Sequence, residues 1–223
     1  MSTPASDPTG PHQGVTRGPA AESPQEKAQF REDWRGRRRA LSPQVRAQES
    51  ADLTEHLLEW YLPRAVHRRA AVVMSYGTEP DTASLRERLH GAGVEVLVPV
   101  TEPGRQLSWV RWRPGVEMGR SPVAPIDEPR GERLPSSTMQ SVDLVVVPAL
   151  TVGRDGYRMG QGGGYYDRFL EGLRLDRERT GHGPVTMSSV FTHELLPVGE
   201  VPVGPLDQPV DAAVTADGIH WVQ

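Results

Sequence analysis

The chain contains no cysteine, and aromatic residues make up only 6% of its 223 residues. The lack of cysteine excludes disulfides, thiolate catalysis and cysteine-based zinc sites. No apolar run approaches the roughly 20 residues that a helix needs to cross a bilayer. The N-terminus also lacks the apolar segment of a signal peptide. We therefore expect a cytoplasmic protein with no membrane partner.

The chain also lacks an excess of basic residues, and its net charge is −4. A chain of this charge has no general attraction for nucleic acid, and we expect no such partner. Large apolar side chains are almost absent from residues 1–23, which hold four prolines and three glycines. Such a segment cannot bury enough surface to offset its ordering entropy. We expect residues 1–23 to be a disordered extension and residues 24–223 to form a single α/β domain.

Two helix start signals follow this extension. Ser23-Pro24-Gln25-Glu26 is a capping box, which predicts a helix that runs to about Ala40. Ser42-Pro43 repeats the signal and predicts a second helix. The candidate core positions of the second helix are Val45, Leu53, Leu57, Leu58 and Tyr61.

Short apolar runs separated by a helix predict a parallel sheet. Residues 70–74 and 94–98 have the composition of buried strands. The helix expected between them is capped by Asp81-Thr82 and carries Leu85 and Leu89 on one face. This strand, helix, strand order is a βαβ unit, and such units make parallel sheets.

The remaining chain extends the same pattern. Residues 142–147 form the clearest buried strand, whereas residues 114–137 are rich in proline, glycine and charge and predict a long irregular connection. Further strands are expected at residues 107–112, 186–191 and 212–215, with a closing hairpin at Asp217-Gly218. The predicted fold class is α/β, with a single open, mostly parallel sheet flanked by helices.

Six of the twelve residues from Gly153 to Gly164 are glycine, and a predicted helix begins directly after them. Glycine lets a ligand approach the backbone closely, and unpaired amides at a helix N-terminus favour anions. Arg158 is suited to hold a phosphate, and Asp167 is suited to bind Mg²⁺ beside it. The turn has neither the ending of a P-loop nor the spacing of a dinucleotide fingerprint. A purely structural, tight connection is the alternative interpretation.

Residues 142–150 and 156–168 together resemble the signature of the 5-formyltetrahydrofolate cyclo-ligase family. Lys27 and Arg31 resemble the family's N-terminal Lys-x-x-x-Arg, and residues 79–82 resemble its Glu-x-Asp-Thr. Asp207 and Asp211 resemble a C-terminal pair of aspartates. The resemblance implies a fold related to the sugar-phosphate isomerase and CoA-transferase (NagB/RpiA-like) group. It also implies an enzyme that uses ATP and Mg²⁺ to convert 5-formyltetrahydrofolate to 5,10-methenyltetrahydrofolate, and a monomer is expected.

The resemblance further implies roles for individual residues, with Arg158 and Lys27 as the catalytic pair. Contacts to ATP are implied for Lys27, Arg31, Arg158, Gly160, Gln161, Gly162, Gly163, Gly164, Tyr165 and Tyr166. Contacts to the folate are implied for Met74, Glu79, Gln161, Gly162, Gly163, Gly164 and Tyr165, and Asp167 and Asp207 are implied as magnesium ligands.

Several of these residues also have a purely structural interpretation. Lys27 and Arg31 lie in a very basic stretch, and charge runs are usually solvated faces. Met74 has the residue type of a core position, Glu79 could help the helix cap, and Asp207 could be an exposed carboxylate in a proline-rich loop.

The chain departs from the family at three places, of which Met159 in place of leucine is a mild change. Val152-Gly153 stands where the family usually has Phe-Asp, and Asp155 is the nearby candidate to substitute for that aspartate. Gln161 replaces a residue that is often arginine. These departures leave open a non-catalytic binder of folate or nucleotide on the same scaffold. A third hypothesis is a module that binds RNA or a partner through the six cations of residues 27–39.

Overall fold

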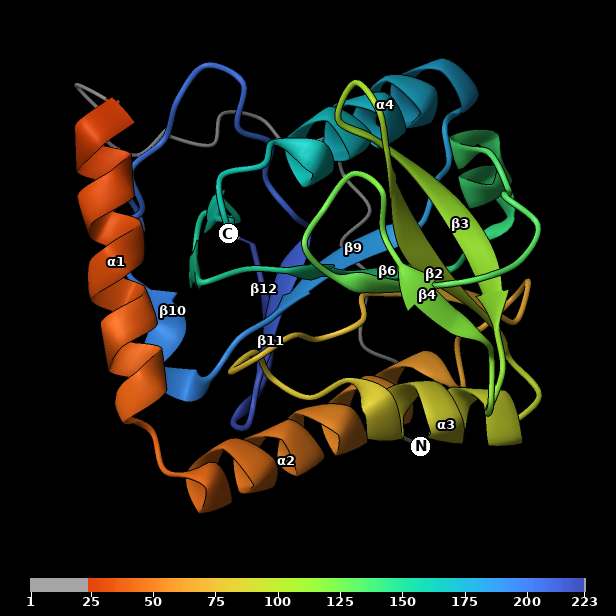
Figure 1. The fold of residues 1–223 in the computed structure, drawn as a ribbon, viewed down its shortest axis with the longest axis horizontal. Coiled ribbons are helices and arrows are strands. Elements are labelled where there is room, and N and C mark those ends of the chain that lie inside the picture. The colour runs from red at the N-terminus through yellow and green to blue at the C-terminus, as the bar shows by residue number, and fades with distance from the viewer. Residues whose placement is uncertain (1–23, 223) are drawn as a thin grey trace, which may run out of the picture.

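The computed structural model describes residues 24–222, so the expected extension and the capping residue Ser23 lie outside the described residues. A seven-stranded sheet crosses the molecule in the order β12-β11-β9-β6-β1-β2-β3 (Figure 1). The bounds of these strands are β1 Arg69–Val72, β2 Glu95–Glu102, β3 Gln106–Trp112, β6 Leu144–Pro148, β9 Val185–Ser189, β11 Ala212–Thr215 and β12 Gly218–Trp221.

The five central strands of this sheet are parallel, and the two edge strands run antiparallel to their neighbours. This confirms the predicted α/β class with a mostly parallel sheet. The expected hairpin at Asp217-Gly218 joins β11 to β12, with Thr215 paired to Gly218. The proposed kinship with the NagB/RpiA-like group stays a prediction.

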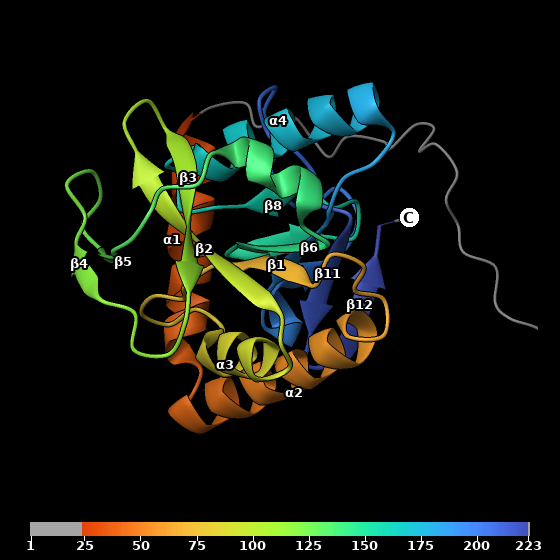
Figure 2. The same cartoon turned by 90° about the vertical axis from the view of Figure 1, so that its right-hand side faces the viewer.

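Helices cover both faces of the sheet. In Figure 1, α2 (Pro43–Tyr61) and α3 (Ala83–Gly91) lie below it, and α4 (Tyr165–Thr180) lies above it. The view in Figure 2 shows the same layers, with the 3-10 helix η1 (Ser136–Ser141) beside α4. Within the described residues, no helix has both the length and the apolar character needed to cross a membrane.

The N-terminal helix α1 (Pro24–Ala40) stands at the side of the sheet rather than on a face (Figure 1). Its Trp34 packs with Met159, Leu196 and Val201 in a small core cluster. This cluster rests on a second, three-stranded sheet, β10-β7-β8, which was not predicted from the sequence. The bounds of these strands are β7 Thr151–Gly153, β8 Arg158–Met159 and β10 Leu195–Leu196.

Local sequence signals account for the helix ends. The Ser42 hydroxyl accepts a hydrogen bond from the Val45 amide at 3.2 Å and so caps α2. The Asp81 carboxylate accepts one from the Ala83 amide at 2.9 Å at the start of α3. Gly164 and Gly181 flank α4 with left-handed backbone angles, φ 72° and 78°, that suit glycine.

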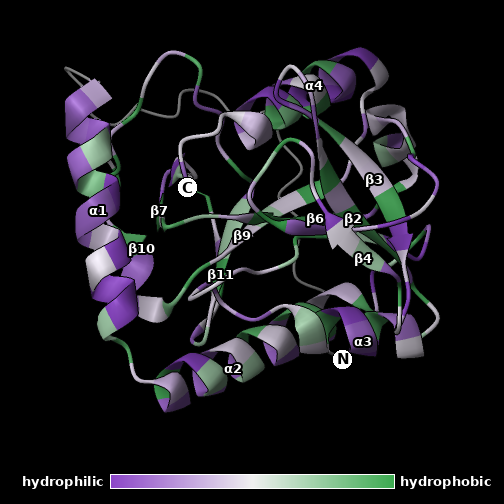
Figure 3. Ribbon diagram, viewed as in Figure 1, coloured by the Kyte–Doolittle hydropathy of each residue, from purple (hydrophilic) through white to green (hydrophobic). Residues whose placement is uncertain are grey.

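Two large core clusters hold the layers together, one on each face of the sheet. Leu53, Leu57, Leu58 and Tyr61 of α2 are buried as predicted, whereas Val45 is 41% exposed and that core prediction was wrong. Val45 lies in the first turn of α2, before the helix reaches the sheet. Figure 3 shows hydrophilic and hydrophobic residues alternating along the helices, as expected when one face of each packs on the protein.

The connection at residues 114–137 is less irregular than expected. It contains a two-stranded antiparallel ladder formed by β4 (Met118–Arg120) and β5 (Asp127–Pro129). The pairing went unpredicted because strands of three residues carry too few side chains for an alternating pattern to show.

Candidate functional site

A pocket of about 770 Å³ opens at the carboxyl ends of β1 and β6. From β1 the chain continues to β2 on one side, whereas β6 leads to β9 on the other. Open α/β sheets bind ligands at such a switch point, because the connections diverge there and leave a crevice. The position of the pocket therefore follows from the topology of the sheet.

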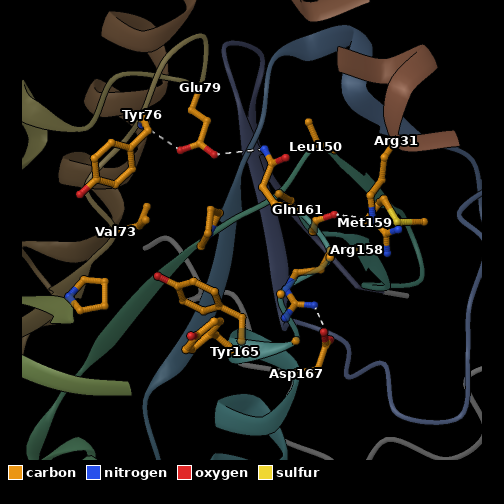
Figure 4. Close-up of a pocket in the computed structure, with 18 of the residues that line it drawn as sticks. Arg31, Val73, Tyr76, Glu79, Leu150, Arg158, Met159, Gln161, Tyr165 and Asp167 are labelled. Atoms are coloured by element: carbon orange, nitrogen blue, oxygen red, sulfur yellow. Dashed lines mark hydrogen bonds and ion pairs between the residues drawn. The ribbon is translucent and has the colours of Figure 1, made fainter. Parts of the chain in front are cut away.

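All fourteen predicted site residues line this one pocket, although they come from four separate parts of the chain. Figure 4 shows several of them converging on the cavity. They are Lys27, Arg31, Met74, Glu79, Arg158, Gly160, Gln161, Gly162, Gly163, Gly164, Tyr165, Tyr166, Asp167 and Asp207. Their individual roles stay predictions.

The glycine turn is open to the pocket. Gly162 and Gly164 adopt positive φ angles of 99° and 72°, which other residues rarely adopt. Within residues 24–222, the amides of residues 161–164 donate no hydrogen bond to another protein group. These amides and the N-terminus of α4 are therefore free to bind an anion.

Arg158 is the buried cation beneath this turn. Its side chain is only 2% exposed, and Nη1 donates to Asp167 Oδ1 at 2.7 Å (Figure 4). Burial lowers the pKa of Arg158, while the Asp167 and Asp207 carboxylates raise it, so the guanidinium stays charged. Burial also raises the pKa of the adjacent Tyr166, which keeps its hydroxyl neutral.

Helix α1 forms the opposite wall of the pocket and donates hydrogen bonds to the glycine turn. Arg31 Nε donates to the Gly160 carbonyl at 3.0 Å, and Arg35 Nη2 donates to Gln161 Oε1 at 2.9 Å. Arg35 thus supplies a positive charge at the position where Gln161 lacks one. Arg35 was not among the predicted site residues, although Lys27, Arg31 and Arg35 recur every four residues on one helix face.

A buried ion pair anchors the same helix. Arg38 Nε and Nη2 donate to the two carboxylate oxygens of Glu194, each at 2.6 Å, and Nη2 also donates to Ala149 O at 2.7 Å. Both side chains are almost completely buried. Five of the six cations in residues 27–39 line the pocket. The basic helix is therefore a wall of the pocket.

Asp207 and Lys27 close the cationic end of the pocket. The Lys27 ammonium forms an ion pair with Asp207 Oδ2, which also accepts a hydrogen bond from the Gly204 amide at 2.7 Å. Asp211, the other member of the expected aspartate pair, does not line the pocket. It instead binds the Arg177 guanidinium at 2.8 Å and the Thr186 amide at 2.7 Å.

Glu79 links the loop after β1 to the glycine turn. It accepts hydrogen bonds from the Tyr76 amide at 3.0 Å and from the Gln161 side-chain amide at 3.5 Å (Figure 4). Burial raises the pKa of the Glu79 carboxyl, and its hydrogen bonds only partly offset this. At the start of α3 the carboxylate that accepts a hydrogen bond from a helix amide belongs to Asp81, whereas the Glu79 carboxylate bonds to Tyr76 and Gln161 instead.

Comparisons with known proteins point to a single family. A sequence model described as the 5-formyltetrahydrofolate cyclo-ligase family matches residues 23–216. A protein of Escherichia coli K12 named 5-formyltetrahydrofolate cyclo-ligase is 30% identical over 190 residues, which cover 84% of this chain and 99% of the relative. A protein of the same name from Mycolicibacterium smegmatis is 33% identical over 158 residues, covering 66% and 76%.

A solved structure has the same fold. The 5,10-methenyltetrahydrofolate synthetase of Aquifex aeolicus superposes with a TM-score of 0.69 at 25% identity, covering 88% of this chain and 93% of that one.

Proposed function

This chain belongs to the 5-formyltetrahydrofolate cyclo-ligase family and is a ligase, and we propose that it closes the ring of 5-formyltetrahydrofolate at the expense of ATP. The products are 5,10-methenyltetrahydrofolate, ADP and phosphate. The observation that carries the proposal is the convergence of five α1 cations, Arg158 and a row of free backbone amides in the glycine turn on one pocket.

The chain's residues have the properties that this reaction requires. A formamide oxygen is a poor leaving group. Transfer of the γ-phosphate of ATP to this oxygen lets it leave as phosphate when N10 of the folate attacks the formyl carbon. The protein mainly orients the reactants and balances phosphate charge. The glycine amides and Arg158 are placed for the phosphates, and Lys27 and Arg31 close over them from α1. No cysteine or serine nucleophile is needed.

The carboxylates fit a magnesium ion. Asp167 and Asp207 both line the pocket, and both lower the cost of charging the buried Arg158. Residues 24–222 contain no group of three acidic or histidine side chains that could hold a metal by themselves. Two carboxylates are enough for Mg²⁺, which takes its remaining ligands from phosphate oxygens and water. When bound, the ion would neutralise phosphate charge.

The experiment is a cyclisation assay that follows methenyl absorbance and ADP release with and without Mg·ATP. Arg158→Ala and Asp167→Ala should each abolish turnover. Arg174→Ala is the matched control, because Arg174 lies in the same helix as Asp167 but forms an exposed pair with Glu178. Full turnover in both pocket variants would refute the proposed site. Saturable folate binding without turnover would favour the non-catalytic binder. Sedimentation of the same sample tests the expected monomer.

A further inference from the structure

A second cavity lies between α4 and the 3-10 helix η1, which are neighbours in Figure 2. Its volume is about 410 Å³, which is within the range of small-molecule sites. Leu107, Phe169 and Leu173 give it an apolar floor. None of the residues to which the proposed reaction assigns a role lines this cavity, so the reaction does not account for it.

The rim of this cavity is cationic. It carries three arginines, Arg105, Arg168 and Arg179, against one carboxylate, Asp176. Asp176 already pairs with Arg179 at 2.9 Å, and Arg168 Nη1 donates to the Gly104 carbonyl at 2.7 Å. Arg105 forms no hydrogen bond or ion pair with any group in residues 24–222. Its guanidinium is therefore free to hold a carboxylate through two parallel hydrogen bonds.

A glycine in the middle of α4 faces the same cavity. Gly172 lines it, although glycine inside a helix is less stable than almost any other residue. Packing within the protein does not explain this glycine, because a Cβ added at Gly172 would meet no protein atom within 4 Å. The missing side chain instead leaves the helix backbone open to a molecule in the cavity.

A bridge between α4 and the turn that joins β2 to β3 separates this cavity from the pocket at the ends of β1 and β6. The hydrogen bond from Arg168 to Gly104 forms the bridge, and Arg105, Leu107 and Arg168 line the spaces on both sides of it. From the bridge the cavity follows α4 from Arg168 to Arg179, which is roughly 16 Å of helix. The two spaces can therefore hold separate molecules.

We propose that this cavity is a second binding site, which takes a small aromatic carboxylate. The ring packs on Phe169 and Leu173 and lies over the open backbone at Gly172. Arg105 holds the carboxylate, and the side-chain amide of Gln140, which has no partner within residues 24–222, is a further donor on the rim. The apolar floor favours such a ligand over inorganic phosphate, which has no apolar part to bury.

The test is calorimetric titration of the full chain with phthalate, a benzene ring that carries two carboxylates. The wild-type protein should bind it saturably, and Arg105→Ala should weaken binding about 10- to 100-fold, as expected for loss of a hydrogen bond between charged groups. Arg174→Ala is the matched control, because Arg174 lies on α4 outside the cavity and pairs with Glu178. It should change the affinity by less than about twofold. Equal losses in both variants would overturn the site, since the general charge of the helix would then attract the probe.

A second variant fills the cavity without disturbing the fold. Gly172→Leu should abolish phthalate binding and raise the midpoint of thermal unfolding, because leucine is the better helix former and its Cβ meets no protein atom. Gly36→Leu is its control, since a Cβ added at Gly36 of α1 also meets no atom within 4 Å. It should raise the same midpoint and leave phthalate binding unchanged.

The titration is repeated with 5-formyltetrahydrofolate present, which should leave the affinity for phthalate unchanged. Competition between the two would assign the cavity to the ligand of the first pocket and overturn a separate site. Phthalate binding that survives Gly172→Leu, or no saturable binding to the wild-type protein, would overturn it as well. The titration needs no turnover, so its result is independent of the cyclisation assay that tests the proposed function.

Discussion

The carboxylate of Asp155 occupies the space into which a side chain at Gly153 would project. A Cβ added at Gly153 would lie 2.2 Å from Asp155 Oδ1. Asp155 is 2% exposed and accepts hydrogen bonds from the Gly199 amide at 3.1 Å and the Tyr157 amide at 3.4 Å. The residue that the family usually has at position 153 thus has a carboxylate counterpart two positions later in the chain.

This overlap predicts a compensated pair. Gly153→Asp alone should lower the free energy of unfolding by about 1–3 kcal/mol, because it crowds a filled site with a second carboxylate. Adding Asp155→Gly removes the clash and should restore most of the stability and turnover. Urea denaturation and the cyclisation assay measure both effects. Additive losses in the double variant would show that the two carboxylates do not share the space.

The loss of folding stability at low pH should depend on Asp211. Burial works to raise the pKa of Asp211, but hydrogen bonds and charge from Arg177 outweigh it and hold this pKa below its usual value of 3.8. A depressed pKa in the folded state means that the ionised form stabilises the fold. The contribution is therefore present above pH 3.8 and disappears as the pH falls through the lowered pKa.

Asp211→Asn should accordingly cost about 1–3 kcal/mol at neutral pH and much less in strong acid. Urea denaturation at a series of pH values measures this difference. Asp176→Asn is the control, since Asp176 forms only an exposed pair with Arg179, and it should cost under about 0.5 kcal/mol. A cost that does not change with pH would mean that the charge of Asp211 is not what stabilises the fold.

The sequence predicted the large elements well because each has a strong local signal. The buried strand β6 is a continuous apolar run, and α2 begins at a serine followed by proline. The short strands β7, β8 and β10 were missed because two or three residues cannot show a period. Their pairing depends on contacts between distant parts of the chain, such as Leu195 with Val152.

The same distinction between local and distant signals explains why only part of the candidate site could be predicted from the sequence. The glycine turn and the cations at Lys27 and Arg31 are local patterns, and the structure brings them to one pocket. Glu128, which also lines the pocket, lies in a charged loop in sequence, and only the folded chain buries it beside Thr101. The meeting of Arg38 with Glu194, 156 residues away, likewise had no local signal.

The pairing of Arg35 with Gln161 yields a prediction about ATP. Arg35 donates to Gln161 Oε1 at the mouth of the glycine turn, so its guanidinium stands in for the arginine that is often found at position 161. Arg35→Ala should raise KM for ATP about 10-fold, which corresponds to one hydrogen bond from a charged donor. Adding Gln161→Arg should return much of the affinity, because it restores a cation at the same place.

Arg37→Ala is the matched control for this pair. Arg37 lies on the same helix but stacks over the Trp34 ring, 4.4 Å from its centroid, and does not line the pocket. Its removal takes the same charge from α1 and should leave KM for ATP within about twofold, because exposed charges at a distance are screened by salt. If Arg37→Ala and Arg35→Ala weaken ATP binding equally, the general field of the helix attracts the nucleotide, and no specific contact from Arg35 is needed.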